Sequence, residues 1–453
     1  MDHYICLSHC WGAFQPLKTT KETLPKFKDN IPWDELPKTF QDAVNVTRWL
    51  GLRYLWIDSL CIIQDDQNDW QEQSAEMANI YGDALLVIAA SVSRSSQSGF
   101  LAEVDPEIRK SFNITETTTD DAQVNVHVRR ALCHGDHWTF PLDQRAWTLQ
   151  EDLLAARVLY FYHDEIIYHC DSDSWCCCSE TTRAQRHKAA MASGLTTPGK
   201  TVKTWHELVE SYTKRRLTNE GDKLPALSGL ARRFQQNFQM TYLAGLWQEQ
   251  LIEDICWYVD GPRNRRHQPS SHCAPSWSWA SVELPVEFPR AMMYHTMGTD
   301  GALTQSVLLG TLDPKLRVLG AECTSNSADP TGSVSGGFLK LGGCIVPATY
   351  RHLMKKWGPH FVERGNLLEP FYADCSVPLP DAATTLLDGD KILVLNLGQL
   401  HWPPDPPSKF RALVLKESKS HLGDFERIGL ILSSENDSED WFKHVQETVI
   451  TVW

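Results

Sequence analysis

The sequence predicts an α/β fold for the first part of the chain, with a parallel sheet and helices on both of its faces. Three apolar segments of strand length alternate with two segments of helical periodicity, and this β-α-β-α-β order carries the prediction. The predicted strands are residues 4–8, 54–57 and 85–90, and the predicted helices are residues 39–50 and 69–81. Successive strands in this order pair in parallel, because each helix returns the chain to the same end of the sheet.

The first predicted helix has start and stop signals. Thr39 is followed three residues later by Asp42, which is the spacing of a capping box. An apolar stripe is supplied by Phe40 and Ala43, and Gly51 follows the helix where glycine commonly ends one. We therefore expect one face of this helix to pack on the sheet.

Polar side chains follow the predicted strands at one end of the sheet. Ser8 ends the first strand, Asp58 follows the second and Ser91 follows the third. The carboxyl ends of parallel strands meet at one edge, and open α/β sheets bind their ligands there. This edge is the predicted site.

The remaining chain divides into further segments. Residues 92–143 show no clear pattern, and residues 158–162 and 165–170 are typical of a hairpin. The predicted domains are the α/β domain at 1–179, a polar linker at 180–203, a helical segment at 204–270 and a β-rich module at 271–453. The clearest strands of that module are residues 316–319, 337–341, 391–396, 412–415 and 428–432.

Composition excludes several classes of protein. The net charge of −14 and the lack of a Lys/Arg-rich block argue against a nucleic-acid partner. No apolar run reaches the roughly 18 residues that a membrane span needs, so no membrane partner is expected. The 13 cysteines are scattered without a C-x-x-C pair, which favours reduced thiols in a cytoplasmic protein.

One short motif points to chemistry. Trp147 and Glu151 are four residues apart, so in a helix both side chains lie on the same face. An aromatic ring beside a carboxylate can exclude water from it and shift its pKa, as an acid/base or electrostatic role requires. The spacing alone is common in helices, and it gains weight from the motifs around it.

Three blocks of sequence resemble the fungal heterokaryon-incompatibility (HET) domain. They occur in the family's order over about 150 residues, and Ala146 stands where relatives often have glycine. The blocks are residues 4–12 (YICLSHCWG), then 36–43, 55–65 and 77–81, and finally 145–151 (RAWTLQE). Segments at 222–229, 244–247 and 274–279 also resemble sequence that accompanies this domain. Relatives usually have additional residues before the first block, where this chain has only three.

The resemblance implies a fungal cytoplasmic protein of non-self recognition and regulated cell death. HET domains are similar to TIR domains, which have a flavodoxin-like sheet, so the implied fold is a flavodoxin/TIR-like parallel sheet with flanking helices. Some TIR domains cleave the N-glycosidic bond of NAD with the glutamate of a W-x-x-x-E motif. The implied role of Glu151 is therefore that of the catalytic carboxylate, with Trp147 as its packing partner, NAD as substrate and no required cofactor.

Residues near the strand ends complete the predicted site. Asp58 is the second catalytic candidate, and the loops after the first two strands, which include Trp11 and Asp58, are expected to hold the ribose and stack the base. The predicted substrate-binding residues are Ser8, His9, Trp11, Gly12, Arg145 and Trp147. No metal ligand set is predicted, because the Cys176–Cys178 triplet with Cys170, His163 and His169 matches no standard zinc spacing.

Several of these residues have structural alternatives. Glu151 can instead form a surface ion pair with Arg145 or Arg157, and Asp58 can cap the turn that follows it. Cys61 as a nucleophile, with His9 as its base, is a weaker interpretation than Cys61 as a buried thiol. The G-x-x-x-x-G-K-T match at 194–201 lacks the preceding strand of a P-loop, so a linker explains it better.

Two other functions remain open. In one, the domain is a non-catalytic signalling module that assembles with itself or with another incompatibility protein. In the other, a HET-like scaffold serves as an enzyme of fungal specialised metabolism on a different small molecule. Loss of activity in a folded Glu151→Gln variant counts against the non-catalytic module. The identity of the product distinguishes NAD cleavage from an enzyme that acts on a different small molecule.

Overall fold

The computed structural model divides into two compact units, Met1–Gly194 and Leu195–Trp453. The residues that it describes are 2–12, 17–101, 111–117, 123–129, 140–163, 165–176, 198–259, 274–289, 293–297, 303–307, 311–326, 329–355, 358–374, 386–400, 409–433 and 441–453. Within these residues, no helix has both the length and the apolar content needed to cross a membrane.

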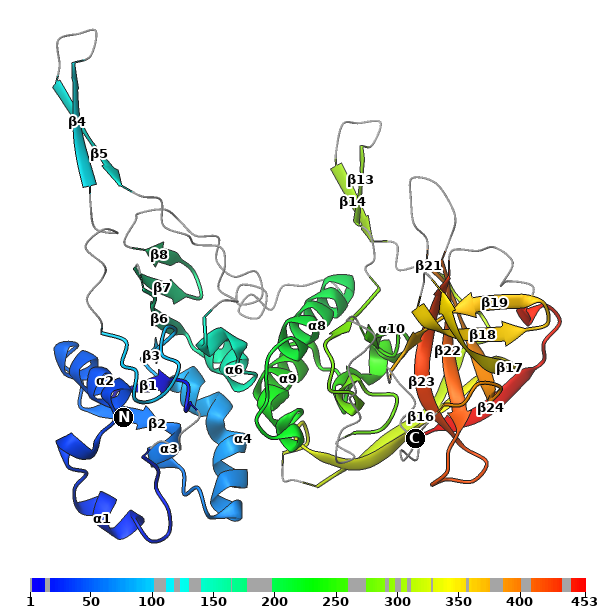
Figure 1. The fold of residues 1–453 in the computed structure, drawn as a ribbon, viewed down its shortest axis with the longest axis horizontal. Coiled ribbons are helices and arrows are strands. Elements are labelled where there is room, and N and C mark those ends of the chain that lie inside the picture. The colour runs from blue at the N-terminus through cyan, green and yellow to red at the C-terminus, as the bar shows by residue number, and fades with distance from the viewer. Residues whose placement is uncertain are drawn as a thin grey trace. The chain divides into compact units, whose positions relative to one another are not determined.

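A six-stranded sheet organises the first unit (Figure 1). The strand order is β2-β1-β3-β6-β7-β8, and the first four strands are parallel while β7 and β8 are antiparallel to their neighbours. The strands are β1 (Tyr4–Ser8), β2 (Tyr54–Ile57), β3 (Leu86–Ala89), β6 (Arg157–Phe161), β7 (Ile166–Cys170) and β8 (Ser174–Cys176). The predicted α/β class and the predicted hairpin, which is β6–β7, are confirmed.

Helices cover both faces of this sheet. Ile5 and Leu7 of β1 pack with Phe40 of α2 on one face, whereas Cys6 packs with Met77 of α4 on the other. The alternation follows from the strand's two-residue period, so β1 is buried on both sides. The helices of the unit are α1 (Leu24–Asp29), η1 (Trp33–Glu35), α2 (Lys38–Trp49), α3 (Asp58–Cys61), α4 (Gln67–Asp83), η3 (Leu142–Gln144) and α6 (Trp147–Leu154).

The predicted capping box of α2 is wrong. The helix has no side-chain cap at its N-terminus. The Thr39 hydroxyl instead donates to the carbonyl oxygen of Ser95 at 3.1 Å. The buried Asp42 carboxylate accepts hydrogen bonds from the backbone N–H groups of Phe100 and Leu101 at 2.9 and 3.1 Å. These long-range partners outcompete the local cap, and they tie the segment after β3 to α2.

A hairpin lies in the region where the sequence predicted no element. It consists of β4 (Ser111–Thr117) and β5 (Gln123–Arg129), which pair antiparallel from Ser111–Arg129 to Thr117–Gln123. Alternate residues of both strands place five large apolar side chains on one face, and all five are exposed. They are Phe112, Ile114, Val124, Val126 and Val128.

The second unit begins with helices and short strands around an aromatic core. Five tryptophan side chains are fully buried there: Trp205, Trp247, Trp257, Trp277 and Trp279. The elements are α8 (Pro198–Thr213), η4 (Glu220–Asp222), α9 (Pro225–Phe238), β9 (Tyr242–Leu243), β10 (Leu246–Trp247), η5 (Gln248–Gln250), α10 (Leu251–Asp254), β11 (Tyr258–Val259), η6 (Trp279–Ser281), β12 (Val286–Glu287), β13 (Met293–Met297) and β14 (Leu303–Val307). The last residues of the predicted linker lie in α8, as does the end of the P-loop-like match, and their earlier residues lie outside the described part.

A ten-stranded sheet forms the rest of the second unit (Figure 1). Its longest strand, β17, pairs with β16, β18, β21 and β24. The strands are β15 (Thr311–Leu312), β16 (Arg317–Ser325), β17 (Val334–Lys355), β18 (Gly358–Arg364), β19 (Leu367–Pro370), β20 (Tyr372–Ala373), β21 (Lys391–Leu400), β22 (Lys409–Glu417), β23 (Phe425–Ser433) and β24 (Glu447–Val452). The prediction of a β-rich C-terminal region is confirmed, since its five clearest strands fall on β16, β17, β21, β22 and β23.

The described cysteines are mostly free thiols. They are Cys6, Cys10, Cys61, Cys170, Cys256, Cys323 and Cys344. Cys176 differs, because it is disulfide-bonded. The expectation of reduced thiols is therefore confirmed for these seven cysteines and wrong for Cys176.

Candidate functional site

The carboxyl end of β1 brings together residues that are far apart in the sequence. Ser8, the last residue of β1, donates a hydrogen bond from its Oγ to Oε2 of Glu151 on α6. Tyr81 of α4 forms a second side-chain hydrogen bond with Glu151. The Tyr81 hydroxyl also lies 3.2 Å from the carbonyl oxygen of Leu7. Three elements therefore hold one carboxylate at the strand end.

Burial dominates the electrostatics of Glu151. Only 5% of the residue is exposed, and this burial raises the pKa of the carboxyl from 4.5 to about 7. The hydrogen bond from Ser8 opposes the rise, the negative charge of Asp58 adds to it, and the positive charge of Arg145 opposes it. A carboxyl with this pKa populates both protonation states at neutral pH.

Asp58 lies at the next strand end and is fixed by two donors. The indole Nε1 of Trp11 donates to Oδ2 of Asp58 at 2.8 Å, and the backbone N–H of Ser59 donates to Oδ1 at 2.7 Å. The side chain of Asp58 keeps 19% of its surface exposed. The sequence analysis offered turn capping as an alternative role for Asp58. This role is present in part, because Asp58 is the first residue of α3 and accepts a hydrogen bond from a backbone N–H of that helix.

His9 is buried between these groups with unused hydrogen-bonding capacity. The residue is 3% exposed, and neither ring nitrogen has a hydrogen-bond partner among the described residues. Its Nδ1 lies 3.7 Å from Oδ1 of Asp58, and its ring packs edge-on against Phe40. Burial lowers the pKa of the imidazole to about 4, so His9 is neutral at pH 7.

The loop after β1 requires a glycine. Gly12 has φ +86°, and a Cβ added at this position would overlap the Cβ of Ser95. The absent side chain lets this loop pass against the segment that follows β3. The loop that carries His9 and Trp11 is thereby held close to the neighbouring strand end.

Comparison with known proteins identifies the unit that holds this site. Residues 4–151 match the family model described as heterokaryon incompatibility protein (HET). This segment is a HET domain. The match begins with β1 and ends at Glu151, so the HET domain contains both partners of the Ser8–Glu151 hydrogen bond. No curated protein and no solved structure matches the chain.

Arg145 belongs to the last block of the HET domain and sits between η3 and α6. It hydrogen bonds the thiol of Cys10, although burial still raises the pKa of that thiol to about 11. Its positive charge also lowers the pKa values of His9 and Glu151. The charge of Arg145 therefore opposes that of Asp58, which raises both pKa values.

Trp147 lies on α6, four residues before Glu151, and contacts α4. Its ring lies edge-on to that of Trp70 on α4, with centroids 6.4 Å apart. The ring that hydrogen bonds Glu151 is that of Tyr81, which the sequence analysis did not select as a site residue. Tyr81 ends the HET block at residues 77–81, so its position in that block was the available signal.

Cys61 does not have the properties of a nucleophile. Burial raises the pKa of its thiol, whereas an activated cysteine has a lowered pKa. The pKa of His9, its proposed base, is lowered by burial as well. Cys61 is exposed, so the buried-thiol alternative is wrong as well, although nearby groups desolvate the thiol enough to raise its pKa.

Among the described residues, no three His, Cys, Asp or Glu side chains are grouped so that they could hold a metal ion. Of the cysteine-rich segment considered above, Cys177 and Cys178 lie outside the described residues. The site of the HET domain brings together two carboxylates, two hydroxyls, a neutral imidazole and the cation of Arg145.

Proposed function

We propose that the HET domain hydrolyses the N-glycosidic bond of NAD or a related nucleotide, with Glu151 as its catalytic carboxylate. The proposed setting is the cytoplasm of a fungal cell, in non-self recognition and regulated cell death. One observation carries the proposal: a buried carboxyl with a pKa of about 7 stands at the carboxyl end of β1, hydrogen-bonded by Ser8 and Tyr81. An acid/base residue needs a pKa near the working pH.

The chemistry uses both protonation states of Glu151. Cleavage breaks the bond between ribose C1′ and the nicotinamide nitrogen, and the electron pair leaves with that nitrogen. The ribose gains positive charge in the transition state, which the ionised carboxylate stabilises. Water then adds to C1′ and gives its proton to Glu151, and the proton leaves to solvent before the next turnover. The proposed reaction consumes NAD and water and needs no further cofactor.

Neighbouring groups supply contacts for the substrate. The Asp58 carboxylate keeps lone pairs beyond those used by Trp11 and Ser59, and these can accept from a ribose hydroxyl. The unpartnered ring nitrogens of His9 are buried polar atoms whose hydrogen bonds a bound ligand can complete. Arg145 supplies the cationic group that a nucleotide's phosphates require.

The strand order supports the predicted fold relationship. The parallel strands follow the order β2-β1-β3-β6, which is the order in which flavodoxin-like sheets begin. Such sheets bind nucleotides where the chain switches direction between the first and third strands. Ser8 stands at the end of β1, at this switch point. This supports a TIR-like arrangement for the HET domain.

A second candidate function is a non-catalytic module that assembles with itself. The β4–β5 hairpin favours it, because the apolar face formed by Phe112, Ile114 and the three valines of β5 is exposed. A two-stranded hairpin is marginally stable alone, and large exposed apolar faces commonly mark interaction sites. In this function Glu151 has a structural role and ties α6 to β1.

The test is nicotinamide release from NAD by the purified full chain, followed by chromatography. Glu151→Gln is the informative variant, because the amide keeps an oxygen that accepts from Ser8 but cannot ionise. Glu72→Gln is the matched control, since Glu72 is exposed on α4. We expect release by the wild type and the control, and a loss of at least about 100-fold in Glu151→Gln.

Three outcomes decide between the candidates. Release that survives in Glu151→Gln contradicts the assigned role of Glu151. No release by any variant at high protein concentration contradicts NAD cleavage. In that case, self-association that persists in Glu151→Gln and is lost in Phe112→Ser supports the assembly module, whereas turnover of another small molecule supports the specialised-metabolism alternative.

A further inference from the structure

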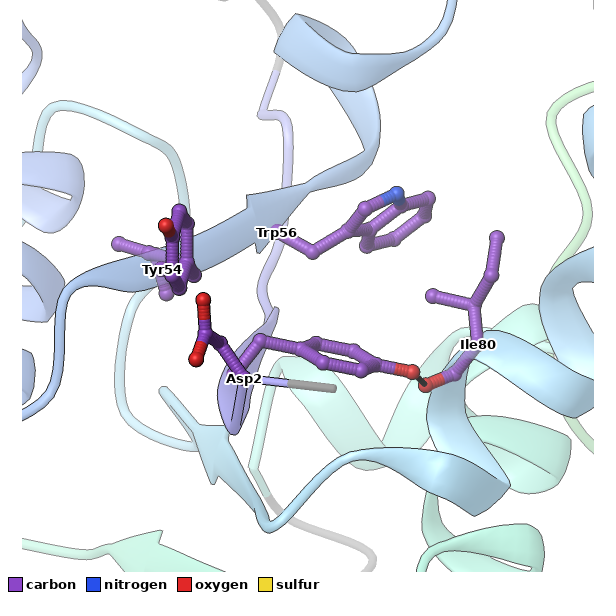
Figure 2. Close-up of a pocket in the computed structure, with 6 residues that line it drawn as sticks. Asp2, Tyr54, Trp56 and Ile80 are labelled. Carbon is purple, nitrogen blue, oxygen red and sulfur yellow. Dashed lines mark hydrogen bonds between the residues drawn. The ribbon is translucent and has the colours of Figure 1, made fainter.

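A hollow of about 450 Å³ lies where β1 and β2 begin, at the other end of these strands from Ser8 and Asp58. Its walls come from the segment before β1, from both strands and from α4 (Figure 2). The lining residues are Asp2, Tyr4, Tyr54, Leu55, Trp56 and Ile80. Three of the six are aromatic and one is a carboxylate, so the chemistry of this hollow differs from that of the candidate site.

Two of the three aromatic rings, those of Tyr4 and Trp56, are held in place before any ligand binds. Tyr4 and Tyr54 are direct neighbours in the parallel register of β1 and β2, and Trp56 follows two residues later on the same face. The Tyr4 hydroxyl donates to the carbonyl oxygen of Ile80 at 2.7 Å, which fixes that ring. The Trp56 ring lies edge-on to Tyr81, with centroids 5.5 Å apart. A ligand therefore meets rings that lose little conformational freedom on binding.

Two carboxylates, those of Asp2 and Asp83, bring negative charge to the hollow. Figure 2 shows the Asp2 carboxylate turned toward the ring of Tyr54, with Trp56 and Ile80 across the hollow. The charge of Asp83, at the end of α4, also acts on Tyr4. One cation of the chain already uses a ring here, since the Arg53 guanidinium lies 5.9 Å from the centroid of Tyr54. Aromatic faces and a carboxylate together attract a cation.

We propose that this hollow binds a small N-alkylated ammonium ion. The carboxylate of Asp2 repels anions, and a neutral apolar ligand would cover that carboxylate without pairing it. A metal ion would need several oxygen ligands, whereas most of the lining is carbon. An alkylated ammonium spreads its charge over methyl groups that pack on ring faces, which is how aromatic cages recognise such ions. The proposal does not depend on NAD cleavage, because the hollow lies at the opposite ends of β1 and β2.

The test compares choline with dimethylbutanol, its neutral isostere in which carbon replaces the nitrogen. Binding to the full chain is measured by saturation-transfer NMR and by calorimetry. Two variants probe the lining: Asp2→Asn removes the charge, and Tyr54→Leu removes a ring that is 47% exposed, so neither should disturb folding. Trp49→Leu is the matched control, because Trp49 on α2 is 72% exposed and outside the hollow.

We expect choline to bind more tightly than dimethylbutanol. Each lining variant should weaken choline binding by about three- to fivefold, and Trp49→Leu should leave it unchanged. Equal binding of choline and its neutral isostere would overturn the proposal, because the site would then not recognise charge. The absence of choline binding, or equal binding by wild type and both lining variants, would overturn it as well.

Discussion

Replacing Glu151 by glutamine should change how the stability of the first unit depends on pH. The pKa of the Glu151 carboxyl rises from 4.5 to about 7 on folding. The folded state therefore binds this proton more tightly than the unfolded state does. Its contribution to stability is complete below pH 4.5 and is lost as the pH rises through about 7. Since each pH unit is worth about 1.4 kcal/mol, the loss is about 3 kcal/mol.

His9 has the opposite effect over nearly the same range. Burial lowers the pKa of its imidazole from 6.5 to about 4, so the unfolded state binds this proton more tightly. The contribution of His9 is complete above pH 6.5 and is lost as the pH falls toward 4. Its size is also about 3 kcal/mol. In the wild type the two effects on stability largely cancel. Replacing either residue therefore leaves the pH dependence that the other one causes.

The assay is urea unfolding of the full chain at a series of pH values. In Glu151→Gln, the free energy of unfolding of the first unit should rise by about 3 kcal/mol between pH 4 and 6.5, as the remaining His9 dictates. In His9→Gln, it should fall by about 3 kcal/mol between pH 4.5 and 7, as the remaining Glu151 dictates. The control variant Glu72→Gln should follow the wild type. The reasoning is refuted if both variants keep the wild-type profile or if the two slopes are exchanged.

Two further predictions follow from the same site. Gly12→Ala should destabilise the first unit by about 3 kcal/mol, because a β-carbon at φ +86° also overlaps Ser95. Gly51→Ala should cost only about 1 kcal/mol, since its φ is +73° but its surroundings are open, and equal losses in urea unfolding would contradict this account. If the HET domain cleaves NAD, the rate of nicotinamide release should rise with pH through about 7, because the transition state needs ionised Glu151. A rate that falls over this range would exclude the ionised carboxylate.

Periodicity was sufficient for most elements of the fold. The apolar runs of β1 and β3 and the amphipathic stripes of α2 and α4 report burial directly, because an alternating or helical pattern fixes which side chains face the sheet. The apolar run of β2 predicted a strand correctly, but β2 lies at the sheet edge and its Tyr54 is exposed. The strands of the C-terminal region were found for the same reason. The β4–β5 hairpin was missed because its apolar residues alternate within a polar stretch and none of them is buried in a core.

Local signals failed where distant partners decided the outcome. Thr39 and Asp42 have the spacing of a cap, yet both bind the segment after β3. Each of these residues could bind either a local backbone group or a distant one. Tertiary packing brought the distant partner within hydrogen-bond distance, and that partner is bound.

The sequence by itself determined the order of strands and helices in the first unit, the HET domain at residues 4–151 and the identity of most residues at the strand ends. Only the tertiary structure decided that Ser8 and Tyr81 are the partners of Glu151, that His9 is buried beside Asp58, and that Tyr4, Tyr54 and Trp56 line a common hollow. The physical reason is the range of the forces. The periodicity of a strand or helix can be read from residues that are close together in the sequence. The pKa of a carboxyl, in contrast, depends on every charge and hydrogen bond that folding places around it.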